Sequence, residues 1–415
     1  METLVRTARR THGFRESVIR GMSRLAREHR AINLAQGFPN FPAPDLLKDA
    51  AARAIHDDIN QYAITWGALR LREAVARKYE RWYGLAADPE REITVTCGAT
   101  EAMISTLLAL VDPGDEVIVF EPFYENYGPD TILADARPIY LPLDPGQPLD
   151  LDRLAGAFSP RTRAIIVNTP SNPSGRVLTR AELGAIAELC VRHDVVAVTD
   201  EIYEHIRFEG DHIPIATLPG MRERTVTISG ASKTFSVTGW RIGWILAPAA
   251  LTAAIRKVHD FLTVGAPAPL QEGVATALDQ LDATFYEALT AMYRGKRDLL
   301  HSALEGAGFR CLPPEGAYYI LADYSGLGPA AADAAPDDTA FAVWLSREVG
   351  VTPVPGSSFY REGGSRSSVR FVFCKTEEIL TEAARRLRTL WDDRPPGSGE
   401  RAREDEPAVE SGWQR

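Results

Sequence analysis

The stretch SGASKTFSVTGWRIGW, residues 229–244, places Lys233 on a tight turn of small residues directly after a short apolar run. That run, residues 225–229, is long enough for one buried strand. A lysine held beyond a buried strand loses hydration, which lowers its pKa and leaves a neutral amine able to attack a carbonyl. Most loop lysines are simply solvated, so the meaning of Lys233 depends on the residues that surround it in the fold.

The chain around this turn alternates between short β-branched runs and segments with helical periodicity. Helices are expected over residues 100–111, 124–133 and 179–193, and strands over residues 93–97, 116–120, 137–141, 164–168, 195–199, 225–229 and 242–247. This alternation predicts an α/β fold with a mostly parallel seven-stranded sheet and helices on both faces. Ligands of such sheets bind beyond the carboxyl ends of the strands, which is where Lys233 is expected.

Changes of pattern divide the chain into four expected parts. They are an N-terminal arm that packs with the small domain (1–44), a large α/β domain (45–290), a small α+β domain (291–391) and a tail (392–415). The arm carries a predicted surface helix over residues 17–29. The tail is polar and rich in proline, glycine and glutamate, a composition that predicts disorder.

Composition narrows the functional class. The 415 residues are 45% hydrophobic and 25% charged, with a formal net charge of −10, which argues against nucleic-acid and anionic-membrane partners. No apolar run approaches the ~18 residues of a membrane span, and no signal-peptide core is present, so we expect a cytoplasmic protein. The four cysteines and the histidines show no metal-ligand spacing, which predicts buried free thiols and no metal site.

Three further motifs supply partners for Lys233. GATEA, residues 98–102, begins a predicted helix whose free N–H groups suit a phosphate. NTPSNPSG, residues 168–175, is either a rigid loop or a turn that projects two amides, and TDEIY, residues 199–203, places Asp200 at the end of a buried strand. Alone, Asp200 is equally well a helix N-cap or the partner of a pyridinium nitrogen. With Arg241 for a phosphate and Tyr124 for ring stacking, the set predicts a pyridoxal phosphate site.

At this point the chain resembles a known family, the class I/II aminotransferases of the fold type I pyridoxal phosphate enzymes. A highly specific series begins with TDEIY, continues with the SK whose lysine lies 33 residues after the aspartate of TDEIY, and ends with TGWRIG. Before this series, the motifs INLAQGFP, NQY and EPFYENY appear in order. The resemblance covers about residues 17–390. It is strongest to the kynurenine, glutamine and methionine aminotransferase branch.

The resemblance implies a role for each matching residue. The catalytic residues would be Lys233, which forms the Schiff base and transfers the proton, Asp200 at the pyridine nitrogen, and Tyr203. The residues implied to bind the cofactor are Ala99, Thr100, Tyr124, Asn168, Asp200, Tyr203, Ser232, Lys233, Arg241 and Tyr62. Those implied to bind the substrate carboxylate are Gly37, Asn172 and Arg370. Family members often carry a phosphate-binding serine where this chain has Gly230, and Ser232 is expected to serve instead.

Tyr62 corresponds to a residue that reaches the phosphate of the neighbouring subunit, so the resemblance also implies a homodimer with shared sites. Where kynurenine-type members carry an aromatic side-chain pocket, this chain has Thr100, Val264 and Gly265. The resemblance therefore leaves the amino donor open.

The implied function is transfer of an amino group between an L-amino acid and a 2-oxo acid by a ping-pong mechanism. Alternatives within the same chemistry are a β-lyase acting on cysteine conjugates and a specialised biosynthetic enzyme. A ligand-sensing regulator on the same fold is the non-enzymatic alternative, and the intact Lys233 argues against it. A P-loop NTPase is not expected, because GxxxxGK[ST] is absent.

Overall fold

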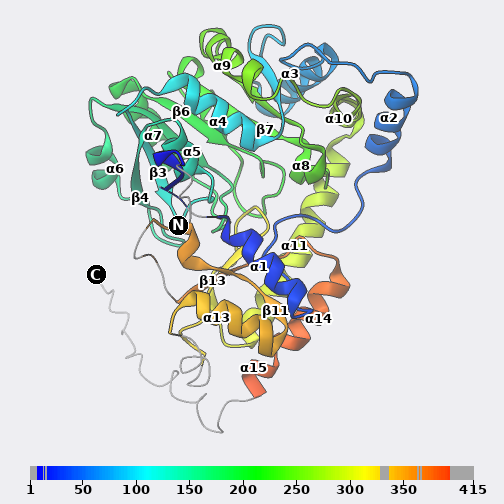
Figure 1. Ribbon diagram of the computed structural model, residues 1–415, viewed down its shortest axis with the longest axis vertical. Helices are drawn as coiled ribbons and strands as arrows, with labels where there is room; N and C mark the ends of the chain where they lie inside the picture. Colours follow the sequence, from blue (N-terminus) through cyan, green and yellow to red (C-terminus); the bar gives the residue numbers. More distant parts are fainter. Residues whose placement is uncertain are drawn as a thin grey trace, which may run out of the picture.

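The computed structural model describes residues 7–12, 14, 16–327, 336–361, 364 and 367–392. A large α/β part lies above a smaller α+β part along the longest axis of the molecule (Figure 1). Within the described ranges, no helix has the length and apolar character needed to cross a membrane. All four cysteines are free; Cys190 and Cys374 are buried as expected, whereas Cys97 and Cys311 are only half-buried.

Of the strands in the described residues, seven form one sheet in the order β2-β8-β7-β6-β5-β3-β4. Their bounds are β2 (Ile93–Thr96), β3 (Glu116–Glu121), β4 (Arg137–Pro142), β5 (Thr162–Asn168), β6 (Val196–Asp200), β7 (Thr225–Gly230) and β8 (Gly243–Leu246). β8 runs antiparallel to both of its neighbours, and the other pairs are parallel. The predicted mostly parallel seven-stranded sheet is confirmed, each strand lying within two residues of its expected bounds.

Helices cover both faces of this sheet, because its central strands are apolar on both sides. Successive side chains of a strand point to opposite faces, so Val117 and Val119 pack with α4, whereas Ile118 and Phe120 pack with α7. The helices of the first face are α4 (Ala99–Leu110), α5 (Tyr127–Leu133) and α9 (Ala249–Leu262). Those of the second face are α6 (Leu151–Ala157) and α7 (Arg180–His193), followed by the short turns η2 (Ile215–Thr217) and η3 (Arg222–Arg224).

A third group of helices closes the end of the sheet at β2. It consists of α2 (Asp45–His56), α3 (Leu69–Tyr83) and α10 (Ala268–Gln280), and its apolar core includes Val95 and Trp244. α10 approaches α2 so closely that a Cβ on Gly273 would lie 2.7 Å from the carbonyl oxygen of Leu47.

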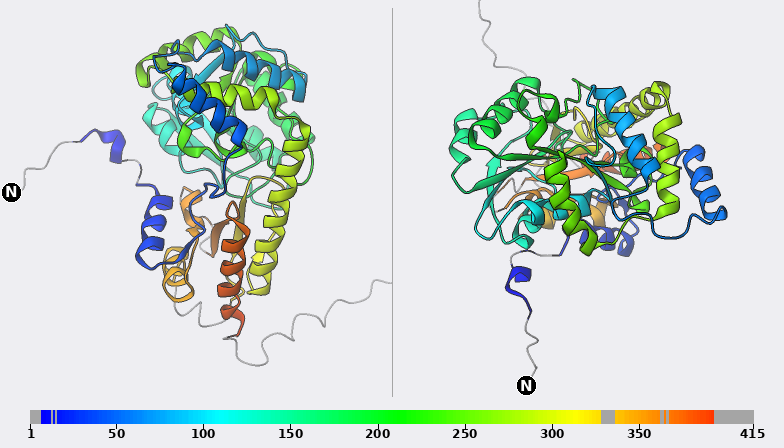
Figure 2. Two further views of the ribbon diagram at one scale, coloured as in Figure 1. Left: turned by 90° about the vertical axis from the view of Figure 1, so that its right-hand side faces the viewer. Right: turned by 90° about the horizontal axis from the view of Figure 1, so that it is seen from above.

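The small part is built on α11 (Ala283–Gly306), a long helix that runs along both parts of the molecule (Figure 2, left). Its antiparallel sheet has the order β12-β13-β10-β9, with β9 (Arg310–Cys311), β10 (Tyr319–Asp323), β12 (Val354–Pro355) and β13 (Ser368–Val372). Around the sheet lie α13 (Asp338–Trp344), η5 (Leu345–Val349), η6 (Gly356–Phe359), α14 (Glu377–Leu387) and α15 (Thr389–Asp392).

The N-terminal segment lies against the small part, where α1 (Val18–Glu28) buries Ile19 and Met22. Preceding it is η1 (Arg9–His12), and following it is β1 (Ile32–Asn33), which pairs in parallel with β11 (Val351–Thr352). The domain boundaries at residues 44, 290 and 391 stay predictions. The predicted disordered tail, 392–415, lies outside the described residues from position 393 onward.

Candidate active site

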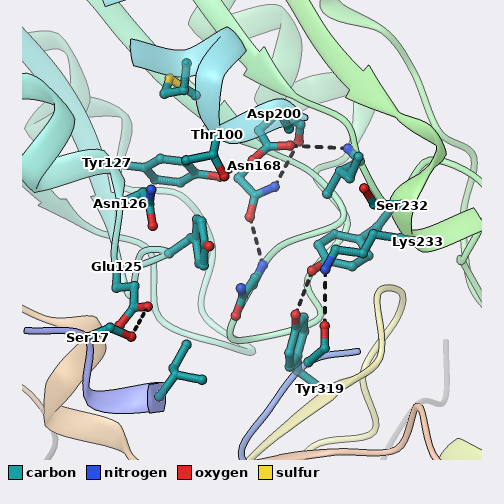
Figure 3. A pocket seen from close by; sticks show the side chains of 18 of the residues that line it. Ser17, Thr100, Glu125, Asn126, Tyr127, Asn168, Asp200, Ser232, Lys233 and Tyr319 are labelled. Atoms are coloured by element: carbon teal, nitrogen blue, oxygen red, sulfur yellow. Dashed lines mark hydrogen bonds between the residues drawn. The ribbon is translucent and has the colours of Figure 1, made fainter. Parts of the chain in front are cut away.

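A cavity of about 330 Å³ lies where the carboxyl ends of the parallel strands meet the small part and α1. Every predicted site residue except Tyr62 lines it, and Figure 3 shows several of them around the cavity: Gly37, Ala99, Thr100, Tyr124, Asn168, Asn172, Asp200, Tyr203, Ser232, Lys233, Arg241 and Arg370. Tyr62 lies elsewhere, with 88% of its surface exposed. The fold thus joins residues that are more than 300 positions apart in the chain.

Lys233 enters the cavity from α8 (Ala231–Thr234), a single turn between β7 and η4 (Thr238–Trp240). Its Nζ donates a hydrogen bond of 3.1 Å to the carbonyl oxygen of Gly37, which also accepts one of 2.9 Å from the hydroxyl of Tyr318. Burial disfavours the charged amine and lowers the pKa of Lys233 to about 8. Lys233 is therefore partly neutral near physiological pH, as a nucleophile or base must be.

Asp200 faces the cavity from the end of β6 and is buried. Its Oδ2 accepts a hydrogen bond of 2.7 Å from the hydroxyl of Tyr127, and its Oδ1 accepts one of 3.3 Å from the backbone N–H of Ile202. Burial raises the pKa of this carboxyl. In the described residues no helix begins at Asp200, so the N-cap alternative is not realised. A carboxyl held in this way suits a pyridinium N–H.

The start of α4 and the guanidinium of Arg241 form an anion-binding corner. Gly98 precedes the helix with a φ of +83°, and a Cβ there would lie 2.3 Å from Nη2 of Arg241. Arg241 donates to the carbonyl oxygens of Cys97 at 3.3 Å and Thr238 at 3.1 Å. The first N–H groups of a helix have no partner within it, so those of Ala99 and its neighbours add donors beside this charge.

Gly230 has a structural reason to lack a side chain. A Cβ at this position would lie 2.9 Å from the carbonyl oxygen of Ile242 and 3.0 Å from the Cα of Gly243. These are backbone atoms of the neighbouring strand segment, which cannot turn aside as a flexible side chain can. Ser232, two residues on, lines the cavity instead.

Arg370 is 1% exposed and comes from β13 of the small part. Its Nη1 donates to Oδ1 of Asn172 at 2.8 Å and its Nη2 to the carbonyl oxygen of Ala35 at 2.6 Å, while its buried Nε has no hydrogen-bond partner among the residues that the structure describes. The guanidinium also lies 4.4 Å from the ring centre of Tyr319. A buried arginine with an unused N–H at a cavity is suited to bind a carboxylate.

The side chains of Tyr203 and Asn168 both hydrogen-bond to other groups of the protein. The hydroxyls of Tyr203 and Tyr319 are 2.6 Å apart. Asn168 donates to the carbonyl oxygens of Asp200 at 2.8 Å and Pro170 at 3.3 Å, and accepts from the backbone of Asn172 at 2.8 Å. Asn168 therefore holds the NTPSNPSG turn against β6 as well as facing the cavity.

Sequence reasoning missed two tyrosines that line the cavity and whose hydroxyls hydrogen-bond to predicted residues. Tyr127 lies within EPFYENY, three positions after Tyr124, and the i, i+3 spacing in a predicted helix was a usable signal for it. Tyr319 carries no such signal, because it reaches Tyr203 from the small part across 116 positions.

These groups fit pyridoxal phosphate. The enclosed amine of Lys233 can attach it covalently, the carboxyl of Asp200 matches its ring nitrogen, and the corner at Arg241 supplies donors for its phosphate. The guanidinium of Arg370, which uses only one N–H of Nη1 and one of Nη2 in the bonds to Asn172 and Ala35, remains for a second anion.

Comparisons with known proteins agree with this geometry. A profile of the family described as "Aminotransferase class I and II" matches residues 29–387. The chain is 41% identical over 371 residues to methionine aminotransferase of Escherichia coli, covering 89% of this chain and 94% of that protein. It is 38% identical over 396 residues to human kynurenine–oxoglutarate transaminase 1, covering 88% and 93%.

Solved structures show the same relationship. N-succinyldiaminopimelate aminotransferase from Mycobacterium tuberculosis superposes with a TM-score of 0.88 at 42% identity, covering 93% of this chain and 100% of that one. Aspartate aminotransferase from Thermus thermophilus, in its structure with maleate, gives 0.85 at 34% identity, covering 93% and 100%.

Proposed function

The chain belongs to the class I and II aminotransferase family, and from this membership we propose that it moves an amino group between an L-amino acid and a 2-oxo acid by a ping-pong mechanism. It is an enzyme of the transaminase class, and its cofactor is pyridoxal 5'-phosphate. The observation that carries the proposal is the convergence of Lys233, Asp200 and Arg370 on one cavity.

The substrate carboxylate binds at Arg370. Asn172 and Ala35 each accept one N–H of this guanidinium, which fixes its plane and leaves its other N–H groups for the substrate. A planar guanidinium anchors a carboxylate in one orientation, and that orientation sets the Cα–H bond of the amino acid relative to Lys233.

Lys233 then acts as the base. With its pKa lowered to about 8, its amine takes the proton from the substrate Cα and returns it one step later. Pyridoxal phosphate, when bound, supplies an electron sink for the charge left on Cα. Asp200, oriented by Tyr127, keeps a proton on the pyridine nitrogen.

An exposed apolar surface beside the cavity supports a homodimer. Tyr62 is 88% and Phe261 93% exposed, and Ile64 and Val264 are about half exposed. The two segments lie together, because Nε2 of the buried His259 is 2.7 Å from the carbonyl oxygen of Thr65. Exposed apolar residues gathered in this way indicate a protein interface. We propose that a second copy covers them and that Tyr62 reaches the phosphate in the partner's site.

Hybrid dimers test the shared site. Homodimers of Tyr62→Phe and of Lys233→Ala should each be weakly active or inactive. If each site takes Tyr62 and Lys233 from different subunits, a heterodimer of the two variants has one intact site. Mixed and refolded samples should then regain up to a quarter of the wild-type activity, because half of the dimers are heterodimers. Mixtures that regain nothing would show that the sites are not shared.

The chemistry is tested with a panel of amino acids. Wild-type protein should absorb visible light when purified with its cofactor and lose that band as an amino donor is consumed, whereas Lys233→Ala should do neither. Lys257→Ala, an exposed lysine of α9, is the matched control. Release of ammonia and pyruvate from cysteine conjugates, in place of transfer, would favour the β-lyase alternative.

Arg370→Ala should raise KM for amino acids by about 30- to 150-fold, because a charge-assisted pair worth about 2–3 kcal/mol is lost. Arg385→Ala, an exposed residue of α14, should leave KM unchanged. An unchanged KM in Arg370→Ala would place the carboxylate elsewhere.

The cytoplasmic location stays a prediction.

A further inference from the structure

His259 is a fully buried histidine of α9 that contacts the first turn of α4. Its Nδ1 lies 3.0 Å from Oε1 of Glu101, and its Nε2 lies 2.7 Å from the carbonyl oxygen of Thr65. A carbonyl oxygen and an ionised carboxylate only accept hydrogen bonds, so each ring nitrogen faces a group that needs a donor. The geometry therefore holds His259 as an imidazolium, paired with the carboxylate of Glu101.

Glu101 belongs to the helix start that forms the anion-binding corner with Arg241. Ala99 and Thr100 line the cavity, whereas the side chain of Glu101 turns back along the chain, where its Oε2 accepts the backbone N–H of Cys97 at 3.0 Å. The carbonyl oxygen of the same Cys97 accepts a hydrogen bond of 3.3 Å from Nη2 of Arg241. Glu101 and Arg241 thus hold the two ends of one backbone residue, directly before the turn that faces the cavity.

An unpaired carboxylate at Glu101 would oppose a phosphate in this corner. A helix N-terminus attracts negative charge, and a carboxylate in the first turn already occupies part of that field. Its charge would also offset the charge of Arg241, and Glu101 is only 7% exposed, so water screens it little. His259 removes this conflict, because the imidazolium and the carboxylate together carry no net charge.

The groups around His259 favour its protonated form. Burial alone would lower the pKa of this histidine, but the hydrogen bond and the charge of Glu101 outweigh burial. The carbonyl of Thr65 and the charge of Asp260, the next residue of α9, contribute in the same direction, and the pKa of His259 is raised above its usual value. The imidazolium required by the two acceptors is therefore also the form that the neighbouring charges stabilise.

We propose that His259 is a positioning residue for the cofactor phosphate, because it neutralises Glu101 and so keeps the start of α4 able to bind a dianion. His259 does not itself line the cavity, so it acts through Glu101. The inference rests on the proposed function in one respect: it takes the phosphate of the cofactor to lie at the corner formed by α4 and Arg241.

Reversible binding of pyridoxamine 5'-phosphate to the apoprotein, measured by equilibrium dialysis, tests this, because an amine cannot form a Schiff base with Lys233. Pyridoxamine is the second probe, and the ratio of the two dissociation constants measures what the phosphate contributes. His259→Gln keeps a donor in place of Nε2, and His259→Asn keeps one in place of Nδ1, but neither carries a charge. Each should weaken binding of pyridoxamine 5'-phosphate by about 10- to 100-fold and binding of pyridoxamine by less than about twofold.

Glu101→Gln separates the charge from the structure. The double variant Glu101→Gln/His259→Gln has no carboxylate left to neutralise, so its ratio should return to within about threefold of the wild-type ratio. His193→Gln, at an exposed position of α7, is the matched control and should bind both probes as the wild type does. Thermal unfolding shows which variants are folded, and His259→Asn decides the test if His259→Gln is not.

Three results would overturn the inference. They are a folded His259 variant that binds pyridoxamine 5'-phosphate as tightly as the wild type, a double variant that binds it as weakly as His259→Gln, and an Arg241→Met protein whose ratio is unchanged. Failure of the proposed function would look different. A wild type that shows the expected ratios but converts no amino donor would refute that function and leave the role of His259 in place.

Discussion

Tyr127 donates a hydrogen bond of 2.7 Å to Asp200, a residue 73 positions away. The bond joins α5 on one face of the sheet to the end of β6, and both residues are buried. A hydroxyl donor partly offsets the cost of placing a carboxylate in a poorly hydrated site, and it fixes which way the carboxylate points. Tyr127 is therefore a positioning residue for Asp200.

Tyr127→Phe should lower kcat/KM for amino donors by about five- to thirtyfold, because a hydrogen bond to a buried charged group contributes about 1–2 kcal/mol. The same variant should bind pyridoxal phosphate more weakly, as measured by equilibrium dialysis. Tyr140→Phe is the control, since Tyr140 lies in β4 and does not line the cavity. Equal activities in wild type and Tyr127→Phe would show that Asp200 needs no orientation.

The uptake of pyridoxal phosphate by the apoprotein should depend on pH through Lys233. Because its pKa is lowered from 10.5 to about 8, the neutral fraction of the amine rises from about a tenth at pH 7 to about nine-tenths at pH 9. The rate of covalent uptake, followed by absorbance after rapid mixing, should rise over this range and then level off. A rate that still climbs tenfold per pH unit above pH 9 would contradict a lowered pKa.

Gly230→Ser should destabilise the protein and should not strengthen cofactor binding. The added Cβ would lie 2.9 Å from a backbone oxygen, and overpacking of this kind costs about 1–3 kcal/mol. Chemical denaturation measures the loss. Gly184→Ser, where a Cβ meets nothing within 4 Å, provides the comparison. Tighter cofactor binding in Gly230→Ser would contradict this, because it would mean that the backbone at Ile242 and Gly243 can move away to admit the added side chain.

The buried side chains of Lys78 and Glu204 should stabilise each other in the folded protein. Lys78 contacts Glu204, each 2% exposed, and Glu204 also accepts the hydroxyls of Tyr83 and Ser229 at 2.6 Å. Burial would raise the pKa of Glu204, but Lys78, with smaller contributions from His205 and His212, outweighs burial and holds that pKa below its ordinary value. Glu204→Gln and Lys78→Met should each cost about 3–5 kcal/mol, because each leaves one buried group unpaired.

The double variant should cost clearly less than the sum of the two single ones, as measured by denaturant unfolding. The depressed pKa of Glu204 means that its contribution is present above about pH 4.5 and is lost only as the pH falls through its value in the folded protein. Additive single losses would show that the two side chains do not stabilise each other.

Much of the fold was predictable because its signals are local. The seven strands are short β-branched runs, and α2 and α3 show helical periodicity, so the period of the side chains sets the elements. The ends of the parallel strands predicted that Lys233 and Asp200 would lie together, because the carboxyl ends of neighbouring parallel strands open on one edge of the sheet. The resemblance to a known family supplied the remaining predicted residues, such as Arg370.

The sequence by itself determined these elements, the family and many of the residues that line the cavity, among them Lys233, Asp200 and Arg370. Only the tertiary structure decided how they pair. Arg370 meets Ala35 across 335 positions, Tyr127 was found to be the partner of Asp200, and the backbone of β8 and its neighbours leaves no room for a side chain at Gly230. The physical reason is that hydrogen bonds and steric contacts depend on distances between elements, which no local pattern of residues contains.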